Sequence, residues 1–178
     1  MDENEADIRN FTVKYPDTAS GLLRYLQRGA FANEVSGTMR TYIVRDRKTN
    51  KCAGYFSLKA GLVSLQEHKL SDDESLFDTL PGVEVAYFAV NENYAKGGKG
   101  FGATIFEDVV EPVIREASKQ IGIYLIYAYA LPIPSLIENY QRNYGLARLS
   151  PDAEKDLHAR LRPRTDKNCI FMYKLAHG

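Results

Sequence analysis

Cysteine is scarce in this sequence, and its histidines are scattered. The 178 residues include two cysteines, Cys52 and Cys169, which are too few for a disulfide framework. Neither cysteine stands in a CxxC pattern or beside a histidine at a metal-binding spacing, and His68, His158 and His177 lie far apart in the chain. We therefore expect two free thiols, no metal and a cytoplasmic location.

The chain also lacks a long apolar run and an excess of charge. No apolar stretch approaches the ~18–20 residues that cross a bilayer, and the acidic first ten residues do not resemble a signal peptide. Lysine plus arginine and aspartate plus glutamate number 23 each, so the net charge gives no indication of nucleic-acid binding. We expect no membrane interaction, a disordered leader over residues 1–7, and one domain over residues 1–178.

The spacing of apolar residues predicts a mixture of strands and helices. Helical spacing predicts helices from residue 18, from about 103 to 117 with a kink at Pro112, and from 135 to about 142. The charged, proline-containing stretch 150–168 is expected to be a surface loop insertion. Apolar and β-branched runs predict strands at 11–13, 41–44, 52–58, 83–90, 121–130 and 170–175. This order predicts a single α+β domain with a mixed, mostly antiparallel central sheet and flanking helices.

A cluster of glycines directly follows the most apolar strand. Four glycines lie between Gly97 and Gly102, and a predicted helix begins immediately afterwards. Successive glycines let backbone N–H groups converge, and the first turn of a helix adds unpaired N–H groups and a positive dipole end. Lys96 and Lys99 add positive charge. The cluster therefore predicts a phosphate or pyrophosphate site, with a plain glycine turn as the alternative.

Two common phosphate-binding motifs do not fit the cluster. The nucleoside triphosphate loop requires Ser or Thr after its lysine, and Lys99 is followed by Gly100. The run from Gly98 to Ala103 matches GxGxxA, a weak dinucleotide fingerprint. That fingerprint is accompanied by an acidic residue about 20 positions later, and residues 120–124 contain none. Dinucleotide binding is therefore disfavoured.

Three stretches together resemble the GNAT superfamily of N-acetyltransferases. The segment from Gly100 to Gly102 fits the second half of the family's turn Q/R-x-x-G-x-G/A, although Gly97 stands where Gln or Arg is usual. The run from Asn139 to Leu146 is similar to the family's FYxxxGF segment with one residue inserted. The segment 54–58 is similar to the family's upstream hairpin, and the resemblance extends over roughly residues 20–175.

The resemblance implies a site for acetyl-coenzyme A, used as a co-substrate without a metal. In this family the pantetheine lies in a V-shaped split between two strands, here 83–90 and 121–130, and the glycine turn wraps the pyrophosphate. The residues that the resemblance places at the coenzyme are Phe88, Ala89, Val90, Lys96, Gly97, Gly98, Lys99, Gly100, Phe101, Gly102 and Ala103.

Two side chains are candidates for the proton transfers that accompany acetyl transfer to an amine. By the resemblance, Tyr140 lies within reach of the thioester sulfur, where a phenol can protonate the leaving thiolate. Tyr144 competes for this role because the inserted residue shifts the register. Glu84 is the single charged residue in its eight-residue apolar run and is the candidate base. A packing tyrosine and an exposed strand-start glutamate are the alternatives.

The amine acceptor is left open among small molecules, peptides and tRNA, and a homodimer is one option for the assembly. Segments 22–25, 40–44 and 54–58 are laid out as in the toxin branch of the family, whose members acetylate aminoacyl-tRNA. The zero net charge counts against an RNA substrate. A further alternative is a non-catalytic module that binds coenzyme A, which the glycine at position 97 favours.

Overall fold

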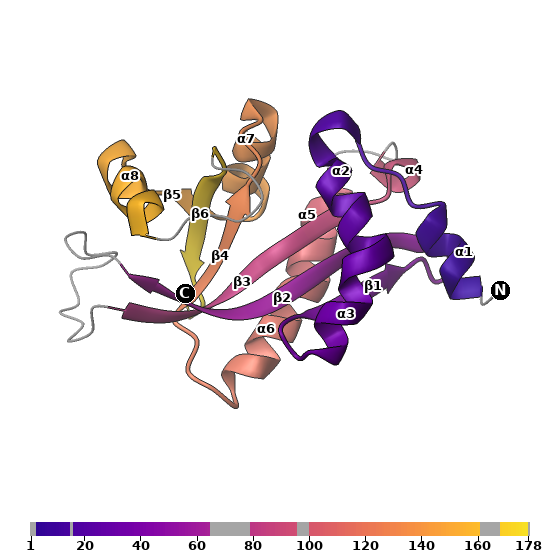
Figure 1. Cartoon of the computed structure of the whole chain (residues 1–178), viewed down its shortest axis with the longest axis horizontal. Coiled ribbons are helices and arrows are strands. Elements are labelled where there is room, and N and C mark those ends of the chain that lie inside the picture. The colour runs from indigo at the N-terminus through magenta and orange to yellow at the C-terminus, as the bar shows by residue number, and fades with distance from the viewer. Residues whose placement is uncertain (1–2, 15, 65–78, 96–99, 161–167, 178) are drawn as a thin grey trace. The chain divides into compact units, whose positions relative to one another are not determined.

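A computed structural model describes residues 3–14, 16–64, 79–95, 100–160 and 168–177 (Figure 1). The chain forms two compact units. The first comprises Met1–Lys59 and Val85–Val113, and the second comprises Ala60–Glu84 and Ile114–Gly178. The strands follow the order β1-β2-β3-β4-β6-β5 in one six-stranded sheet. The expected α+β fold with a mixed, mostly antiparallel sheet and flanking helices is confirmed.

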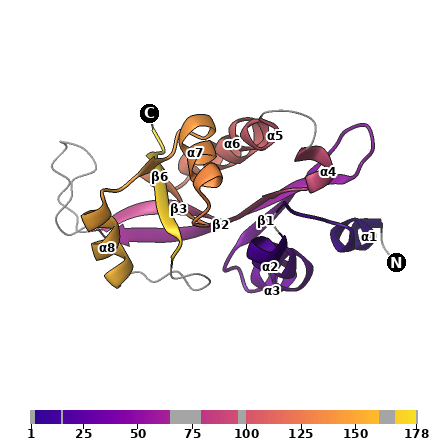
Figure 2. The ribbon, with the colours of Figure 1, turned by 90° about the horizontal axis from the view of Figure 1, so that it is seen from above.

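The first unit contains the predicted hairpin and most of the helices. In the hairpin, β1 pairs antiparallel with β2, with Tyr42 opposite Phe56. Figure 2 shows α2 and α3 on one face of these strands and α5 on the other. The elements are α1 (Glu3–Arg9), α2 (Pro16–Arg24), η1 (Tyr25–Gly29), α3 (Ala30–Val35), β1 (Arg40–Arg45), the first part of β2 (Cys52–Ser64), the last part of β3 (Thr79–Val90), α4 (Glu92–Ala95), α5 (Phe101–Ile105), η2 (Phe106–Val110) and the start of α6 (Glu111–Ser118).

The second unit contains the remaining parts of β2, β3 and α6 and the elements that follow them. Strand β3 pairs in parallel with β4 over residues 82–84, while β4 pairs antiparallel with β6 along its full length. The further elements are β4 (Leu125–Ala130), α7 (Pro134–Asn143), β5 (Ala147–Arg148), α8 (Pro151–Arg160) and β6 (Ile170–Leu175). The last strand has the predicted bounds.

The expectation of a disordered leader is wrong for residues 3–7, because they belong to helix α1 (Glu3–Arg9); residues 1–2 lie outside the described residues. Arg9 and Glu5, one helical turn apart, form an ion pair of 2.7 Å. Asp7 binds Arg45 of β1 at 3.0 Å and Lys51 at 3.5 Å. The Arg45 hydrogen bond is the main cause that holds the pKa of Asp7 below its ordinary value. These contacts attach the leader to the hairpin.

The predicted strand at 11–13 does not form, although Phe11 and Val13 are buried. The carbonyl of Thr12 instead accepts the N–H of Glu92 at 3.0 Å, as part of an irregular segment. The predicted strand at 121–130 begins only at Leu125.

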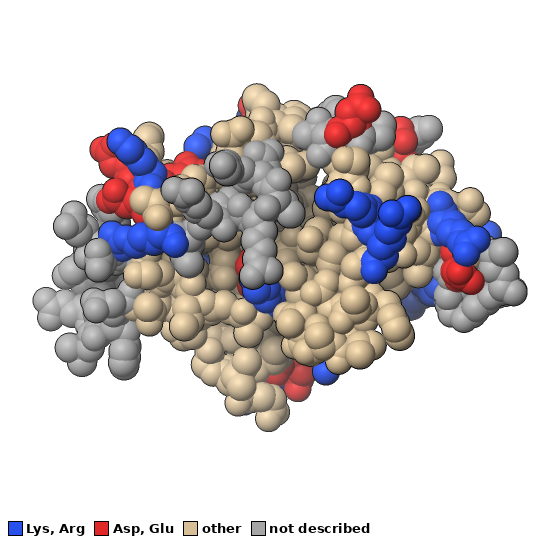
Figure 3. Space-filling model, viewed as in Figure 1, with Lys and Arg blue, Asp and Glu red and all other residues tan. Residues whose placement is uncertain are grey.

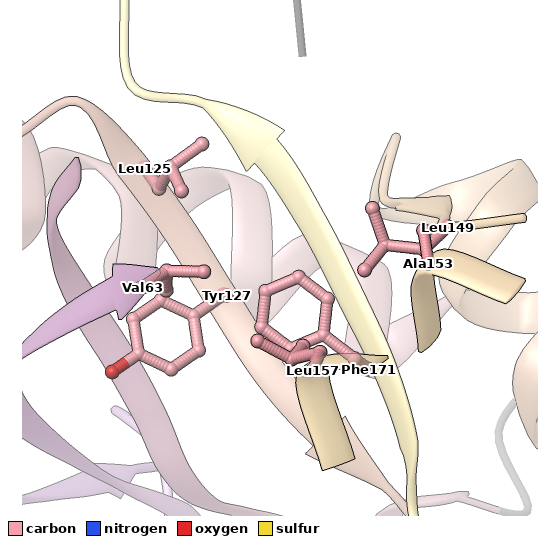
Figure 4. Close-up of a cluster of buried hydrophobic side chains, with 7 residues drawn as sticks. All are labelled: Val63, Leu125, Tyr127, Leu149, Ala153, Leu157 and Phe171. Carbon is pink, nitrogen blue, oxygen red and sulfur yellow. The ribbon is translucent and has the colours of Figure 1, made fainter. Parts of the chain in front are cut away.

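The expected surface loop at 150–168 is also corrected, because residues 151–160 form helix α8. Ala153 and Leu157 pack in an apolar cluster against β4, β6 and the end of β2 (Figure 4). The Glu154 carboxylate accepts the N–H of Phe171 at 3.1 Å and binds Arg148 at 2.9 Å. Asp152, Lys155, Asp156 and Arg160 of this helix are exposed, whereas Glu154 is buried with the apolar side chains. Residues 161–167 lie outside the described residues.

Candidate functional site

The candidate coenzyme strand is the end of β3. Ala89 is buried, and Phe88 and Val90 are half-buried. The ring of Phe88 meets that of Phe106 edge to face, with centroids 5.9 Å apart, which fixes the strand against the helical run that follows it. The structure thus places all three of these predicted residues on one strand, next to the helix that begins after the glycine cluster.

Gly54 of β2 allows this close packing. A Cβ atom at position 54 would lie 3.0 Å from the Ala89 carbonyl oxygen and 3.1 Å from Cδ1 of Ile105. Such distances are tighter than ordinary van der Waals contact, so glycine lets Ile105 of α5 and the end of β3 approach each other closely.

Asn91 ends β3 and was not singled out from the sequence. Its backbone N–H donates to the carbonyl of Ala53 at 2.9 Å, and its side-chain amide donates to the carbonyl of Cys52 at 3.0 Å. Its side-chain oxygen accepts the N–H of Asn93 at 3.1 Å and the hydroxyl of Thr12 at 3.3 Å. Asn91 therefore holds the turn that leads from the strand toward the glycine cluster.

The described part of the glycine cluster opens a helix. Gly100 has φ +112°, a left-handed conformation, and its carbonyl accepts the N–H of Thr104 at 2.7 Å. Helix α5 begins at Phe101 and continues through η2 and α6 to Ser118. The first N–H groups of such a run lack carbonyl partners within the helix, which suits an anion. The structure places Phe101, Gly102 and Ala103 in this first turn, whereas Lys96, Gly97, Gly98 and Lys99 lie outside the described residues.

Tyr140 is buried near the end of α7. Its carbonyl accepts N–H groups from Tyr144 at 3.2 Å and from Leu146 at 3.1 Å, and Gly145 between them has φ +66°. The Leu146 bond therefore closes the end of the helix across the left-handed Gly145. Pro134 in the first turn of α7 suits the other end of the helix.

The two candidate tyrosines are in contact. The rings of Tyr140 and Tyr144 meet edge to face with centroids 4.9 Å apart. Burial is the main cause that raises the pKa of Tyr140, followed by the neighbouring Tyr144 and Cys169. Burial also raises the pKa of Tyr144, while a hydrogen bond with Asn139 opposes that rise. Both phenols therefore keep their protons at neutral pH.

Glu84 lies on β3 opposite Tyr127 of β4, and it is half-buried. Glycines make room for the Tyr127 side chain, since a Cβ at Gly82 would lie 3.0 Å from its ring and one at Gly61 would collide with its phenol oxygen. Burial and then the charge of Glu84 raise the pKa of Tyr127, and the same two causes raise that of Tyr129 to about 12. Glu84 is therefore a carboxylate that influences two phenols of β4.

The candidates fall into two groups that follow the two units. The described coenzyme residues belong to the first unit, and Tyr140 and Glu84 belong to the second. Among the described residues, no group of three or more His, Cys, Asp or Glu side chains could hold a metal. Of the helices that the structure describes, none is both long enough and apolar enough to cross a membrane.

No family model matches the sequence. Solved structures do resemble the chain. AtaT complexed with acetyl-methionyl-tRNAfMet has a TM-score of 0.67 at 17% identity, over 96% of this chain and 89% of that one. AtaTR bound with acetyl-CoA has a TM-score of 0.65 at 18% identity, over 99% and 90%. A KacT variant with a tyrosine replaced by phenylalanine has a TM-score of 0.63 at 18% identity, over 97% and 91%.

AtaT is a toxin, and a variant of it has been solved with acetyl-CoA and the C-terminus of the antitoxin AtaR. The likeness covers nearly all of this chain, and it confirms the GNAT-type fold that the sequence resemblance implied.

Proposed function

We propose that the protein is an acetyl-CoA-dependent N-acetyltransferase that transfers the acetyl group to a primary amine by direct attack on the thioester. The observation that carries this proposal is the left-handed Gly100, which opens a helical run to Ser118 shortly after Asn91 ends β3. A strand end followed by an N–H-rich helix start suits the pantetheine and pyrophosphate of coenzyme A. The likeness to AtaTR bound with acetyl-CoA supports the same ligand.

In this proposal the described coenzyme residues bind and orient. The N–H groups of Phe101, Gly102 and Ala103 would bind the pyrophosphate, since helix starts offer unpaired donors to anions. The backbone at Phe88, Ala89 and Val90 would hydrogen-bond the pantetheine, and the N–H near Val90 would polarise the thioester carbonyl. Lys96, Gly97, Gly98 and Lys99, which lie outside the described residues, are the other residues that the sequence resemblance assigns to the coenzyme. Bound acetyl-CoA supplies the activated acetyl group.

Two side chains would move the protons. A C–N bond forms as the C–S bond breaks, the amine nitrogen loses one proton and the thiolate gains one. Glu84 would accept the proton from the amine, directly or through water, and Tyr140 would donate the proton to sulfur. The raised pKa of Tyr140 supports its part, because the phenol remains protonated and able to donate at neutral pH. The tyrosine-to-phenylalanine variant among the similar KacT structures is in keeping with a functional tyrosine in this fold.

Calorimetry with a matched pair of glycine variants tests the coenzyme site. Gly100 and Gly37 both have positive φ, and an added Cβ would meet nothing within 4 Å at either position. Alanine at Gly37, in the left-handed region, strains the backbone by about 1–2 kcal/mol, and alanine at Gly100 strains it at least as much. We expect Gly100→Ala to weaken acetyl-CoA binding at least tenfold and Gly37→Ala to leave it unchanged. Equal binding by both variants, or no binding by the native protein, would contradict the proposal.

The second candidate narrows the acceptor to the amino group of aminoacyl-tRNA. The observation that favours it is the likeness to AtaT complexed with acetyl-methionyl-tRNAfMet over most of both chains. We expect induced expression to arrest growth and Tyr140→Phe to relieve the arrest. Healthy growth with abundant native protein would remove this candidate while leaving the first standing. Acetyl-CoA binding without thiol release, against amines, polyamines, peptides and charged tRNA, would instead favour a non-catalytic coenzyme-binding module.

A further inference from the structure

One exposed stripe runs along the helical segment from α2 to α3. Arg24, Arg28, Phe31 and Val35 follow one another at intervals of four, three and four residues, so they lie on successive turns. We call these four residues the α2–α3 stripe. Phe31 is 81% exposed and Val35 is 73% exposed, the two highest values among the exposed large hydrophobic side chains of the described residues.

The stripe is separate from the face that this helical segment buries. Tyr25, Leu26 and Ala30 are buried at 6%, 5% and 8% exposure, and the ring of Tyr25 stacks on that of Tyr87 at 3.5 Å. The segment thus already has a packed apolar side. Phe31 and Val35 form a second apolar area that the described part of the chain leaves uncovered, and such areas mark interaction sites when they continue into polar groups.

The arginine end of the stripe carries uncompensated charge. Within the described part of the chain, neither Arg24 nor Arg28 has a carboxylate partner. The nearby Glu34 binds Arg40 and accepts the N–H of Thr41 at 3.1 Å. The Arg40 hydrogen bond is the main cause that lowers the pKa of Glu34, so its charge is committed to that pair. Figure 3 shows Lys and Arg side chains gathered over α2 beside a surface without charge.

We propose that the α2–α3 stripe binds RNA, with Arg24 and Arg28 on backbone phosphates and Phe31 stacked on an unpaired base. This proposal rests on the aminoacyl-tRNA candidate for the acceptor. Guanidinium groups match phosphate geometry with two donors each, and an exposed aromatic ring offers a face on which any base can stack. A second copy of the chain fits less well, because the stripe contains two arginines and no acid to receive them.

Fluorescence anisotropy with labelled, deacylated tRNA tests the arginines. The probe needs no acetyl transfer, so binding and catalysis are read separately. Each phosphate contact contributes about 0.7–0.9 to the slope of log affinity against log salt. We expect the double variant Arg24→Gln and Arg28→Gln to lower that slope by about 1.4–1.8 between about 50 and 200 mM salt. The double variant Arg47→Gln and Lys48→Gln removes two exposed cations elsewhere in the same unit, and it should bind like the native protein.

Variants at Phe31 distinguish base stacking from packing against another protein surface. Leucine keeps the apolar bulk and loses the aromatic face, so Phe31→Leu should weaken tRNA binding about 5- to 100-fold, while Phe31→Tyr should bind normally. Both variants should keep native thermal stability, because the side chain is exposed. Unchanged binding by Phe31→Leu, an unchanged salt slope, or a dimer in light scattering that disappears with Phe31→Ser would overturn the proposal.

The outcomes separate this inference from the proposed function. Acetyl transfer to aminoacyl-tRNA that is indifferent to Arg24, Arg28 and Phe31 would remove the α2–α3 stripe alone. If the protein binds tRNA through the α2–α3 stripe but neither binds acetyl-CoA nor releases free coenzyme A, the acetyltransferase assignment alone is removed.

Discussion

The backbone carbonyl of Tyr140 accepts the N–H of Leu146 at 3.1 Å, across the left-handed Gly145. Helix α7 ends at Asn143, and this bond joins Tyr140, the candidate acid, to the segment that leads to β5. The left-handed conformation of Gly145 therefore helps to fix the backbone position of Tyr140.

Gly145→Ala should consequently harm both stability and activity. An L-residue at φ +66° costs about 1–2 kcal/mol, so we expect a loss of that size in the free energy of unfolding. Acetyl transfer should fall because Tyr140 shifts, while acetyl-CoA affinity should not change. Gly21→Ala is the matched control, since position 21 is in helix α2 with open space around it; there alanine should stabilise by about 0.5–1 kcal/mol. A neutral Gly145→Ala would show that the left-handed helix end is unimportant.

Glu154 should be a main anchor of helix α8. Glu154→Ala removes the acceptor of the buried Phe171 N–H, and leaving such a group unsatisfied costs about 1–3 kcal/mol. Glu154→Gln retains an acceptor oxygen and loses mainly the pair with the partly exposed Arg148, so its loss should be smaller, up to about 1 kcal/mol. Urea unfolding measures both. Glu116→Ala, which removes an exposed ion pair, is the control and should change little. Equal losses for Glu154→Ala and Glu154→Gln would contradict the account of Phe171.

The buried phenols should make the fold sensitive to alkali. The pKa of Tyr129 is raised from about 10 to about 12, and burial raises that of Tyr140 as well. The protonated phenols are favoured in the folded state, so their contribution is complete below about pH 10 and is lost as the pH rises through about 12. Urea midpoints should fall over this window, and absorbance at 295 nm should show late-ionising tyrosines. Tyr129→Phe should reduce the fall. A midpoint that stays constant from pH 9 to 12 would refute the prediction.

Glu84→Gln should slow the reaction without loosening the coenzyme. Removal of a general base lowers kcat by about 10²–10⁴, while the affinity for acetyl-CoA, carried in our proposal by the first unit, should stay native. Tyr127→Phe is the neighbouring control, because it keeps the ring that fills the space at Gly82 and removes the hydroxyl. Native turnover by Glu84→Gln with an identified acceptor would remove its role as a base and leave the coenzyme site intact.

Much of the fold could be predicted from local sequence because its signals are local. Strand β6 begins with four apolar or aromatic residues, Ile170 to Tyr173, and its predicted bounds match the structure. The glycine cluster likewise predicts the start of a helix, and Gly100 is the N-cap residue of α5. Helix α8 was missed because six of its ten residues are charged or polar, and only three-dimensional packing shows that Ala153 and Leu157 face the interior.

The site was less accessible from the sequence, because its supporting contacts join distant residues. Asn91 connects to Cys52 and Thr12, which are 39 and 79 positions away, and a single asparagine carries no local signal of such bonds. The fit of Tyr127 against Gly61 and Gly82 is also a long-range relationship. The inserted residue makes the register ambiguous, so the sequence could not decide whether Tyr140 or Tyr144 is the acid. The two rings are in contact in the structure, so substitution of each tyrosine is the test that distinguishes them.

Transfer of labelled acetyl from acetyl-CoA to an amine, measured with native protein, Tyr140→Phe and Tyr144→Phe, tests the central claim most directly. Methionyl-tRNA and a panel of small amines and peptides serve as acceptors. The account predicts transfer by the native protein, a loss of about 10²-fold or more in kcat for Tyr140→Phe with unchanged acetyl-CoA affinity, and near-native turnover for Tyr144→Phe. Absence of transfer to every acceptor, or native turnover by Tyr140→Phe, would contradict it.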